Sequence, residues 1–122
     1  SWPFEELCCS ALRSLYSEYT IAQTGQWWYG EHEIDVVGLT VGNTLIAGEC
    51  KFQQSPLGYD ALSNLEGHVN ELRWTPKDGS NRVEEYALFS RSGFTQSVTE
   101  AAAERENLRL FTVEDVVAAL NG

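Results

Sequence analysis

The chain has 122 residues, of which 43% are hydrophobic, and carries 18 acidic side chains against 8 lysines and arginines, for a net charge of −10. This length predicts one domain with a real core, and no apolar stretch approaches the length of a membrane span. The excess of negative charge repels nucleic acid at long range, which argues against a protein that coats DNA.

The acidic residues are spread along the chain, and only two lysines accompany them. This pattern is typical of proteins from a salt-saturated cytoplasm, where charge is screened; an ordinary acidic domain is the alternative. The three cysteines, Cys8, Cys9 and Cys50, include no C-x-x-C pair, which disfavours a disulfide framework or zinc site and fits a reducing cytoplasm. We interpret them as small core residues, and His32 and His68 as surface or cap residues.

In chain order, the first half predicts a helix and three strands, followed by a second helix. Apolar residues at three-and-four spacing predict a helix over residues 4–19, and β-forming residues predict a strand over 20–28. Apolar runs at 34–39 and 45–52 predict two further strands joined at Gly42-Asn43, a hairpin signal. Ser55-Pro56 predicts the start of the second helix, with Ser at the N-cap and Pro in the first turn.

The second half predicts a strand at 86–90, a helix from Thr95 or Ser97, a strand at 108–111 and a last helix. Ser97-x-x-Glu100 fits a capping box, and Thr112 fits the N-cap of the last helix. The fold class is therefore α/β, with a mixed sheet of about five strands flanked by helices in the order α-β-β-β-α-β-α-β-α. We expect residues 1–122 to be one domain excised from a longer protein, because the chain has no methionine and Trp2-Pro3-Phe4 resembles a mid-chain entry into a helix.

Three charged side chains interrupt the apolar strands in the middle of the chain. Asp35 lies within 34–39, and Glu49 and Lys51 lie within 45–52. Residues two apart in a strand share a face, so Glu49 and Lys51 point the same way, and charges in a half-buried strand cost free energy unless they are paired or bind something. Asp35, Glu49 and the Cys50 carbonyl could give Mg²⁺ or Mn²⁺ oxygen ligands, with Lys51 steadying an attacking hydroxide and the charge on a phosphate.

These residues resemble the PD-(D/E)xK nuclease superfamily, which has the restriction-endonuclease-like fold. Glu33-Ile34-Asp35-Val36-Val37 and Gly48-Glu49-Cys50-Lys51 carry the resemblance, with Ile34 in place of the proline of the motif. Together with Trp27-Trp28-Tyr29-Gly30 and the run Ser90 to Phe94, they resemble more narrowly the nuclease-like C-terminal domain of archaeal AAA-type ATPases.

The resemblance implies metal-dependent hydrolysis of phosphodiesters by an in-line water. It implies Asp35 and Glu49 as metal ligands and Lys51 as the group that stabilises the transition state. Glu5, on the first helix, is the candidate for a further ligand. The implied partners are DNA, an ATPase module on the same polypeptide and a second copy in a homodimer; DNA and RNA remain open from the residues alone.

The spacing of the hairpin creates a difficulty for this site. A two-residue turn at Gly42-Asn43 would place Asp35 opposite Cys50, facing away from Glu49 and Lys51. The site therefore predicts an odd-length turn, a bulge or a sharp bend near Asp35.

Other polar and aromatic residues have both a functional and a structural interpretation. Glu33 either supports the metal ligands or is an edge residue, and Glu5 also suits the positive end of a helix dipole. Gln53, Arg73 and Arg91 are candidate contacts to nucleic acid, and each is also a plausible surface residue. Trp27 and Trp28 could stack on bases, but we expect both to pack against the core. A nuclease-derived binding or regulatory module with little turnover is the alternative function.

Overall fold

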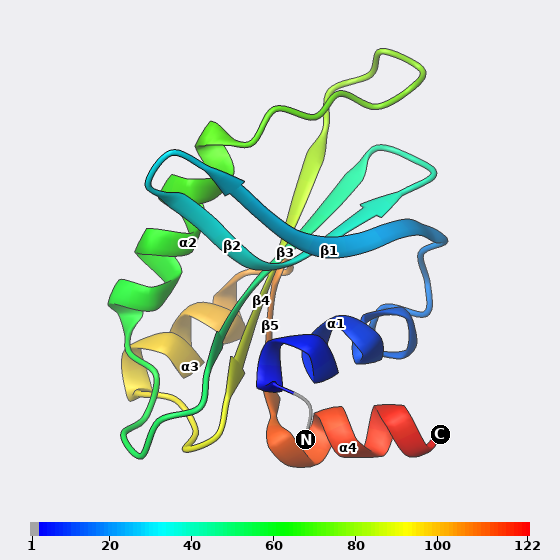
Figure 1. Ribbon diagram of the computed structural model, residues 1–122. Coiled ribbons are helices and arrows are strands. Elements are labelled where there is room, and N and C mark those ends of the chain that lie inside the picture. Colours follow the sequence, from blue (N-terminus) through cyan, green and yellow to red (C-terminus); the bar gives the residue numbers. More distant parts are fainter. Residues whose placement is uncertain (1–2) are drawn as a thin grey trace.

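The computed structural model describes residues 3–122, so Trp2 of the expected helix entry lies outside the described residues. The predicted order of elements is confirmed (Figure 1). The elements are α1 (Phe4–Leu15), β1 (Ile21–Tyr29), β2 (His32–Thr40), β3 (Thr44–Lys51), α2 (Tyr59–Glu71), β4 (Val83–Ser90), α3 (Gln96–Glu104), β5 (Leu108–Thr112) and α4 (Val113–Asn121). None of the helices in residues 3–122 is both long and apolar enough to cross a bilayer.

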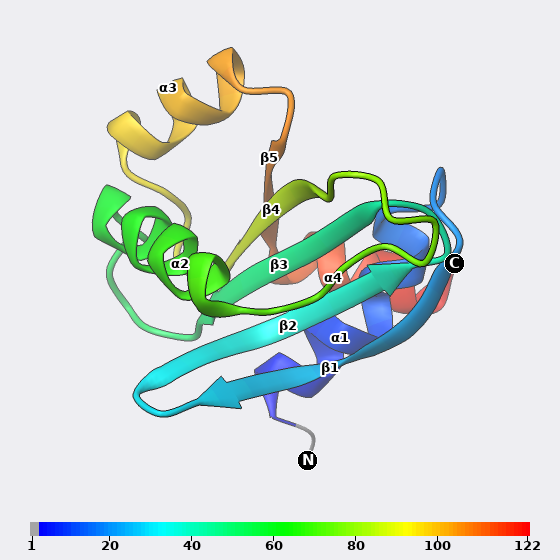
Figure 2. The same cartoon turned by 90° about the horizontal axis from the view of Figure 1, so that it is seen from above.

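The five strands form one mixed sheet in sequence order, β1-β2-β3-β4-β5. β1, β2 and β3 form an antiparallel meander, whereas β4 and β5 run parallel to β3 and to each other. Parallel strands need crossover connections, which α2 and α3 provide. Both crossovers lie on one face of the sheet, while α1 and α4 cover the other (Figures 1 and 2).

Alternation along the strands gives each face its own core, because successive side chains point to opposite sides. On the α1–α4 face, Leu12, Val36 and Phe89 belong to one buried cluster. On the α2–α3 face, Leu62 and Leu88 belong to the other. The central strands β3 and β4 are buried on both faces, which explains their continuous apolar sequences.

One predicted helix start is wrong. α2 begins at Tyr59, with Gly58 at the N-cap, and not at Ser55-Pro56. The backbone ahead of it is held by a tertiary contact, since the Leu57 amide donates to the Gly93 carbonyl and the Leu57 carbonyl accepts from the Thr95 amide. This short parallel bridge overrides the local helix-start signal.

Of the capping interactions predicted for the last two helices, one forms and one does not. The capping box expected at Ser97-x-x-Glu100 does not form, because α3 begins at Gln96 and the Glu100 carboxylate accepts from the side-chain amide of Gln96. At α4 the prediction is confirmed: the Thr112 side chain accepts from the Asp115 amide, and the Asp115 carboxylate accepts from the Thr112 amide.

The end of the first helix and the exposure of Trp28 also differ from the predictions. The first helix ends at Leu15, four residues before the end of its apolar pattern, and the buried ring of Tyr16 follows it in a turn. Trp27 packs against the α2–α3 core, as expected. Trp28, its neighbour, is 63% exposed, because adjacent residues of edge strand β1 point to opposite sides.

Candidate active site

The link between β2 and β3 sets the relative positions of the charged residues. Three residues, 41–43, connect the strands, and the register pairs Val37 with Ala47 and Val36 with Gly48. Continued by one residue, this register places Asp35 opposite Glu49. The prediction of an odd-length turn is therefore confirmed, and the one-residue difference from a two-residue turn reverses the face on which Glu49 and Lys51 lie.

A β-bulge lies next to this point, as also predicted. Gly25 pairs with Val37 but Trp27 pairs with Ile34, so two residue steps on β1 face three on β2. The extra residue falls at Asp35-Val36. Its effect is visible in the core, since Ile34 and Val37 pack on the α2–α3 face while Val36 packs on the α1–α4 face. Asp35 thus occupies an irregular position where β2 changes the direction of its side chains.

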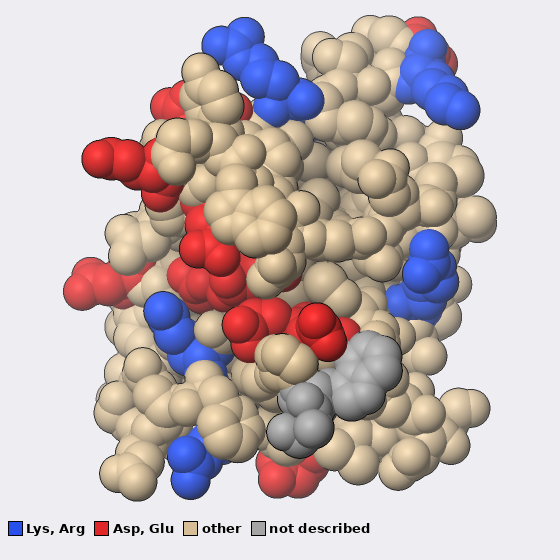
Figure 3. Space-filling view, in the orientation of Figure 1, with Lys and Arg blue, Asp and Glu red and all other residues tan. Residues whose placement is uncertain are grey.

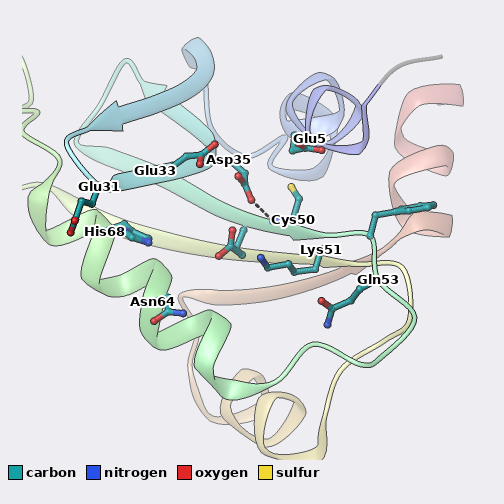
Figure 4. A pocket seen from close by; sticks show the side chains of 11 residues that line it. Glu5, Glu31, Glu33, Asp35, Cys50, Lys51, Gln53, Asn64 and His68 are labelled. Atoms are coloured by element: carbon teal, nitrogen blue, oxygen red, sulfur yellow. Dashed lines mark hydrogen bonds between the residues drawn. The ribbon is translucent and has the colours of Figure 1, made fainter.

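A hydrogen bond from the backbone of β3 holds the Asp35 carboxylate close to that strand. One carboxylate oxygen, Oδ2, accepts from the Cys50 amide at 2.9 Å (Figure 4). Burial and a hydrogen bond with Asp35 raise the pKa of Glu49 from 4.5 to about 8, and the Lys51 ammonium opposes this only in part. The Asp35 and Glu49 carboxyl groups therefore lie close together, and burial with the neighbouring carboxyl group favours the protonated form of Glu49 at neutral pH.

A polar pocket of about 620 Å³ opens above these groups. Acidic side chains gather on this side of the molecule (Figure 3). The Lys51 side chain is the single cationic group in the described lining. The lining consists of Glu5, Glu31, Glu33, Asp35, Glu49, Cys50, Lys51, Phe52, Gln53, Asn64 and His68.

Asp35, Glu49 and Lys51 line one pocket, whereas not all of the other candidate residues lie beside them. Glu5 on α1 and Glu33 on β2 both line the pocket, as does Gln53, whose side-chain amide donates to Ser55 at 3.1 Å. Arg73 lines a different groove, beside Trp74. Within residues 3–122, no three His, Cys, Asp or Glu side chains are arranged to hold one metal ion, so Asp35 and Glu49 would need backbone and water oxygens as further ligands.

Most arginines are engaged inside the protein. Arg13 donates to the Ile21 carbonyl, and Arg82 donates to the carbonyls at the end of α2. Arg105 pairs with Glu66, and Arg109 pairs with Glu18. The guanidinium of Arg91 lies 4.8 Å from the centre of the Phe52 ring, beside the pocket. Few cations therefore remain to meet phosphates.

The cysteines are free thiols, and two of them are buried, as expected of core residues. Burial raises the pKa of Cys9 to about 11. A hydrogen bond with the Cys8 thiol and burial raise the pKa of Cys50, so it stays protonated. Cys50 thus contributes backbone atoms to the site, and its side chain contributes packing.

One pair of residues was missed from sequence. His32 at the start of β2 and His68 on α2 approach with their Nδ1 atoms 2.9 Å apart. Their separation of 36 residues matches no metal-ligand spacing, and only the packing of α2 against the sheet unites them.

Comparisons with known proteins agree with this architecture. The chain is similar in structure to the MspJI restriction endonuclease, solved in complex with a 27-mer oligonucleotide, with a TM-score of 0.66 and 16% identity over 96% of this chain. It is also similar to AspBHI, a DNA modification-dependent restriction endonuclease, with a TM-score of 0.58 and 17% identity over 96% of this chain. The chain spans 27% and 30% of those two proteins, and no curated protein matches it.

The fold is therefore that of a restriction-endonuclease-like domain. Residues 1–68 match the family DUF234, described as archaeal and bacterial proteins of unknown function. Because this match covers more than half of the sequence, the chain belongs to that family.

Proposed function

We propose that this domain is a metal-dependent nuclease that hydrolyses phosphodiester bonds in DNA. The observation that carries the proposal is that Asp35, Glu49 and Lys51 line one acidic pocket, where the Asp35 carboxylate accepts a hydrogen bond from the Cys50 amide. The restriction-endonuclease-like fold supports it, because such domains occur in proteins whose names describe cleavage of DNA.

The donor set fits a hard divalent cation. Mg²⁺ and Mn²⁺ prefer oxygen ligands, and two carboxylates are a common protein contribution to a Mg²⁺ site. Burial and the nearby Asp35 carboxyl group disfavour the charged form of Glu49, and a divalent cation between the two carboxylates would favour it. We assign the Cys50 carbonyl as a third oxygen, Glu5 as a candidate ligand from α1 and Glu33 as a carboxylate that supports the others. Bound there, the ion would lower the pKa of a water and polarise the phosphate.

Other groups of the chain position the reaction. The Cys50 amide fixes one oxygen of Asp35 and so orients the carboxylate. Lys51 reaches into the pocket, where its ammonium can stabilise charge that develops on the phosphate and can hold the attacking water. Gln53, Arg73 and Arg91 are the proposed contacts to the DNA backbone. An ATPase module on the same polypeptide and a homodimer that cuts both strands belong to the same proposal.

A second function has its own support. Phosphate binding depends on cations, and the chain has a net charge of −10 with four of its six arginines engaged internally. These observations favour a nuclease-derived binding or regulatory module with little turnover. The two functions differ in whether metal binding leads to cleavage.

Cleavage assays separate them. The domain is incubated with plasmid and short duplexes in Mg²⁺, Mn²⁺ or chelator, at low and at molar salt. Asp35→Asn and Lys51→Ala are compared with Lys77→Ala, a matched control that removes the other lysine, which lines a separate groove. We expect the first two variants to lose at least about 100-fold in rate, as when a preorganised charge is removed from an active site, and the control to remain active.

Two results would decide against the proposal. Metal-dependent cleavage that survives both Asp35→Asn and Lys51→Ala would show that the activity comes from elsewhere. Binding of Mg²⁺ or DNA without cleavage under every condition would support the regulatory module instead.

A further inference from the structure

His68 lines the same pocket, and His32 contacts it from the β1–β2 hairpin. His32 comes from the tip of the β1–β2 hairpin and His68 from α2, and both side chains are half-buried. Their Nδ1 atoms are 2.9 Å apart, and their rings meet edge to face, with centroids 5.2 Å apart. Two nitrogen atoms from distant segments thus converge on one point.

A contact of this length has two chemical explanations. One Nδ1 can carry a proton and donate it to the other, which joins the rings by a hydrogen bond. Alternatively, both lone pairs can face a cation. Imidazole nitrogen binds Zn²⁺ at about 2.0–2.1 Å, so two ligands at a right angle lie about 2.9 Å apart and two at a tetrahedral angle about 3.3 Å apart. The observed distance fits the first angle, and a small rotation of either ring gives the second.

The surroundings favour a cation. Glu31 and Glu33 flank His32 in the sequence, and both line the pocket together with His68 (Figure 4). Both glutamates are exposed, and their carboxylates concentrate cations at this wall. The Asn64 side chain, one turn before His68 on α2, adds a neutral oxygen to the same wall.

We propose that His32 and His68 form a binding site for a divalent transition metal ion, of the class of Zn²⁺, Co²⁺ and Ni²⁺. Imidazole ligands select these ions, whereas the carboxylate pair on β2 and β3 suits Mg²⁺ and Mn²⁺. Water completes the coordination, and the carboxylates of Glu31 and Glu33 add negative charge nearby. Because the ligands come from the β1–β2 hairpin and from α2, the ion cross-links the two elements and fixes one wall of the pocket.

The site is tested by titrating the purified domain with Co²⁺ and Zn²⁺, without nucleic acid. We expect one equivalent of Co²⁺ to produce visible absorption that the hydrated ion lacks, without the near-ultraviolet band of a cysteine–cobalt bond. A hundredfold excess of Zn²⁺ over its Kd should raise Tm by about 8 °C.

Three variants assign the ligands. His32→Asn and His68→Asn each keep a polar group near the position of Nδ1, so the contact between the hairpin and α2 can persist while imidazole ligation is lost. Both should abolish the Co²⁺ absorption and the Zn²⁺ shift in Tm, with little change in Tm in chelator. Asp35→Asn should keep both signals, because it changes only the carboxylate site.

The proposal is overturned if neither ion binds, which would leave the pair as a hydrogen-bonded contact. It is equally overturned if both histidine variants bind Co²⁺ as the parent protein does, or if Asp35→Asn alone removes the signal. None of these results depends on whether the domain cuts DNA.

Discussion

Replacing Glu49 by glutamine should stabilise the protein in chelator, and the gain should depend on pH. In the folded protein the pKa of Glu49 is about 8, raised from 4.5 by burial and by the contact with Asp35. Between these two values the folded state binds more protons at Glu49 than the unfolded chain does. The contribution of Glu49 to the free energy of unfolding is therefore full at low pH and is lost as pH rises from about 5 to about 8.

The size of the effect follows from the shift. One pKa unit corresponds to about 1.4 kcal/mol, so the whole shift would be about 5 kcal/mol. Water reaches this half-buried carboxyl group from the pocket and screens the repulsion, so we expect about 2 kcal/mol to be measurable. Glutamine resembles the protonated acid in shape and cannot ionise. Glu49→Gln should thus match the parent protein near pH 4 and exceed it by about 2 kcal/mol at pH 9, or about 8 °C in Tm.

Urea denaturation in chelator at several pH values measures this difference. Glu106→Gln is the matched control, because it removes an exposed glutamate in the turn between α3 and β5. The control should show little dependence of its stability difference on pH. Equal stability of Glu49→Gln and the parent protein at pH 9 would refute the inference that burial and the nearby Asp35 carboxyl group disfavour the charged form of Glu49.

Three further substitutions test the packing that supports the site. Gly48→Ala should lower the free energy of unfolding by about 1–3 kcal/mol, because the added Cβ would lie 3.0 Å from the Phe89 ring; an unchanged denaturation midpoint would contradict this. Thr112→Ala should cost about 1 kcal/mol through loss of the capping box with Asp115, and a cost as small as that of a typical surface substitution would argue against the cap. Leu62→Ala, in the α2–α3 core, should cost about 2–5 kcal/mol in the same measurement, and a loss below 1 kcal/mol would mean that the cluster is loosely packed.

The order of elements could be predicted because each segment carries a strong periodic signal. Leu62 and Leu65 recur at helical spacing, and the runs around Ile46 and Leu88 are long enough only for buried strands. The start of α2 could not be predicted in the same way. Ser55-Pro56 is a good local helix start, but the bridge from Leu57 to Phe94 depends on a contact between distant segments.

The candidate site was partly predictable for a similar reason. Charges inside apolar strands single out Asp35, Glu49 and Lys51, and the requirement that they share a face predicts the irregular hairpin that the structure contains. The pairing of His32 with His68 left no trace in the sequence, because it depends on where α2 crosses the sheet. The exposure of Trp28 was mispredicted because a bulky apolar residue suggests burial, whereas edge strand β1 leaves one of its sides open to solvent.

The three-residue link at 41–43 limits how this part of the chain can change in length. Inserting or deleting a single residue there would shift the register of β3 by one position. The side chains of Glu49 and Lys51 would then point to the opposite face of the sheet, into the apolar core beneath α1. Two residues gained or lost would preserve their orientation. Length variation at this loop should therefore be tolerated in even steps, although the loop itself lies at the opposite end of the hairpin from the carboxylates.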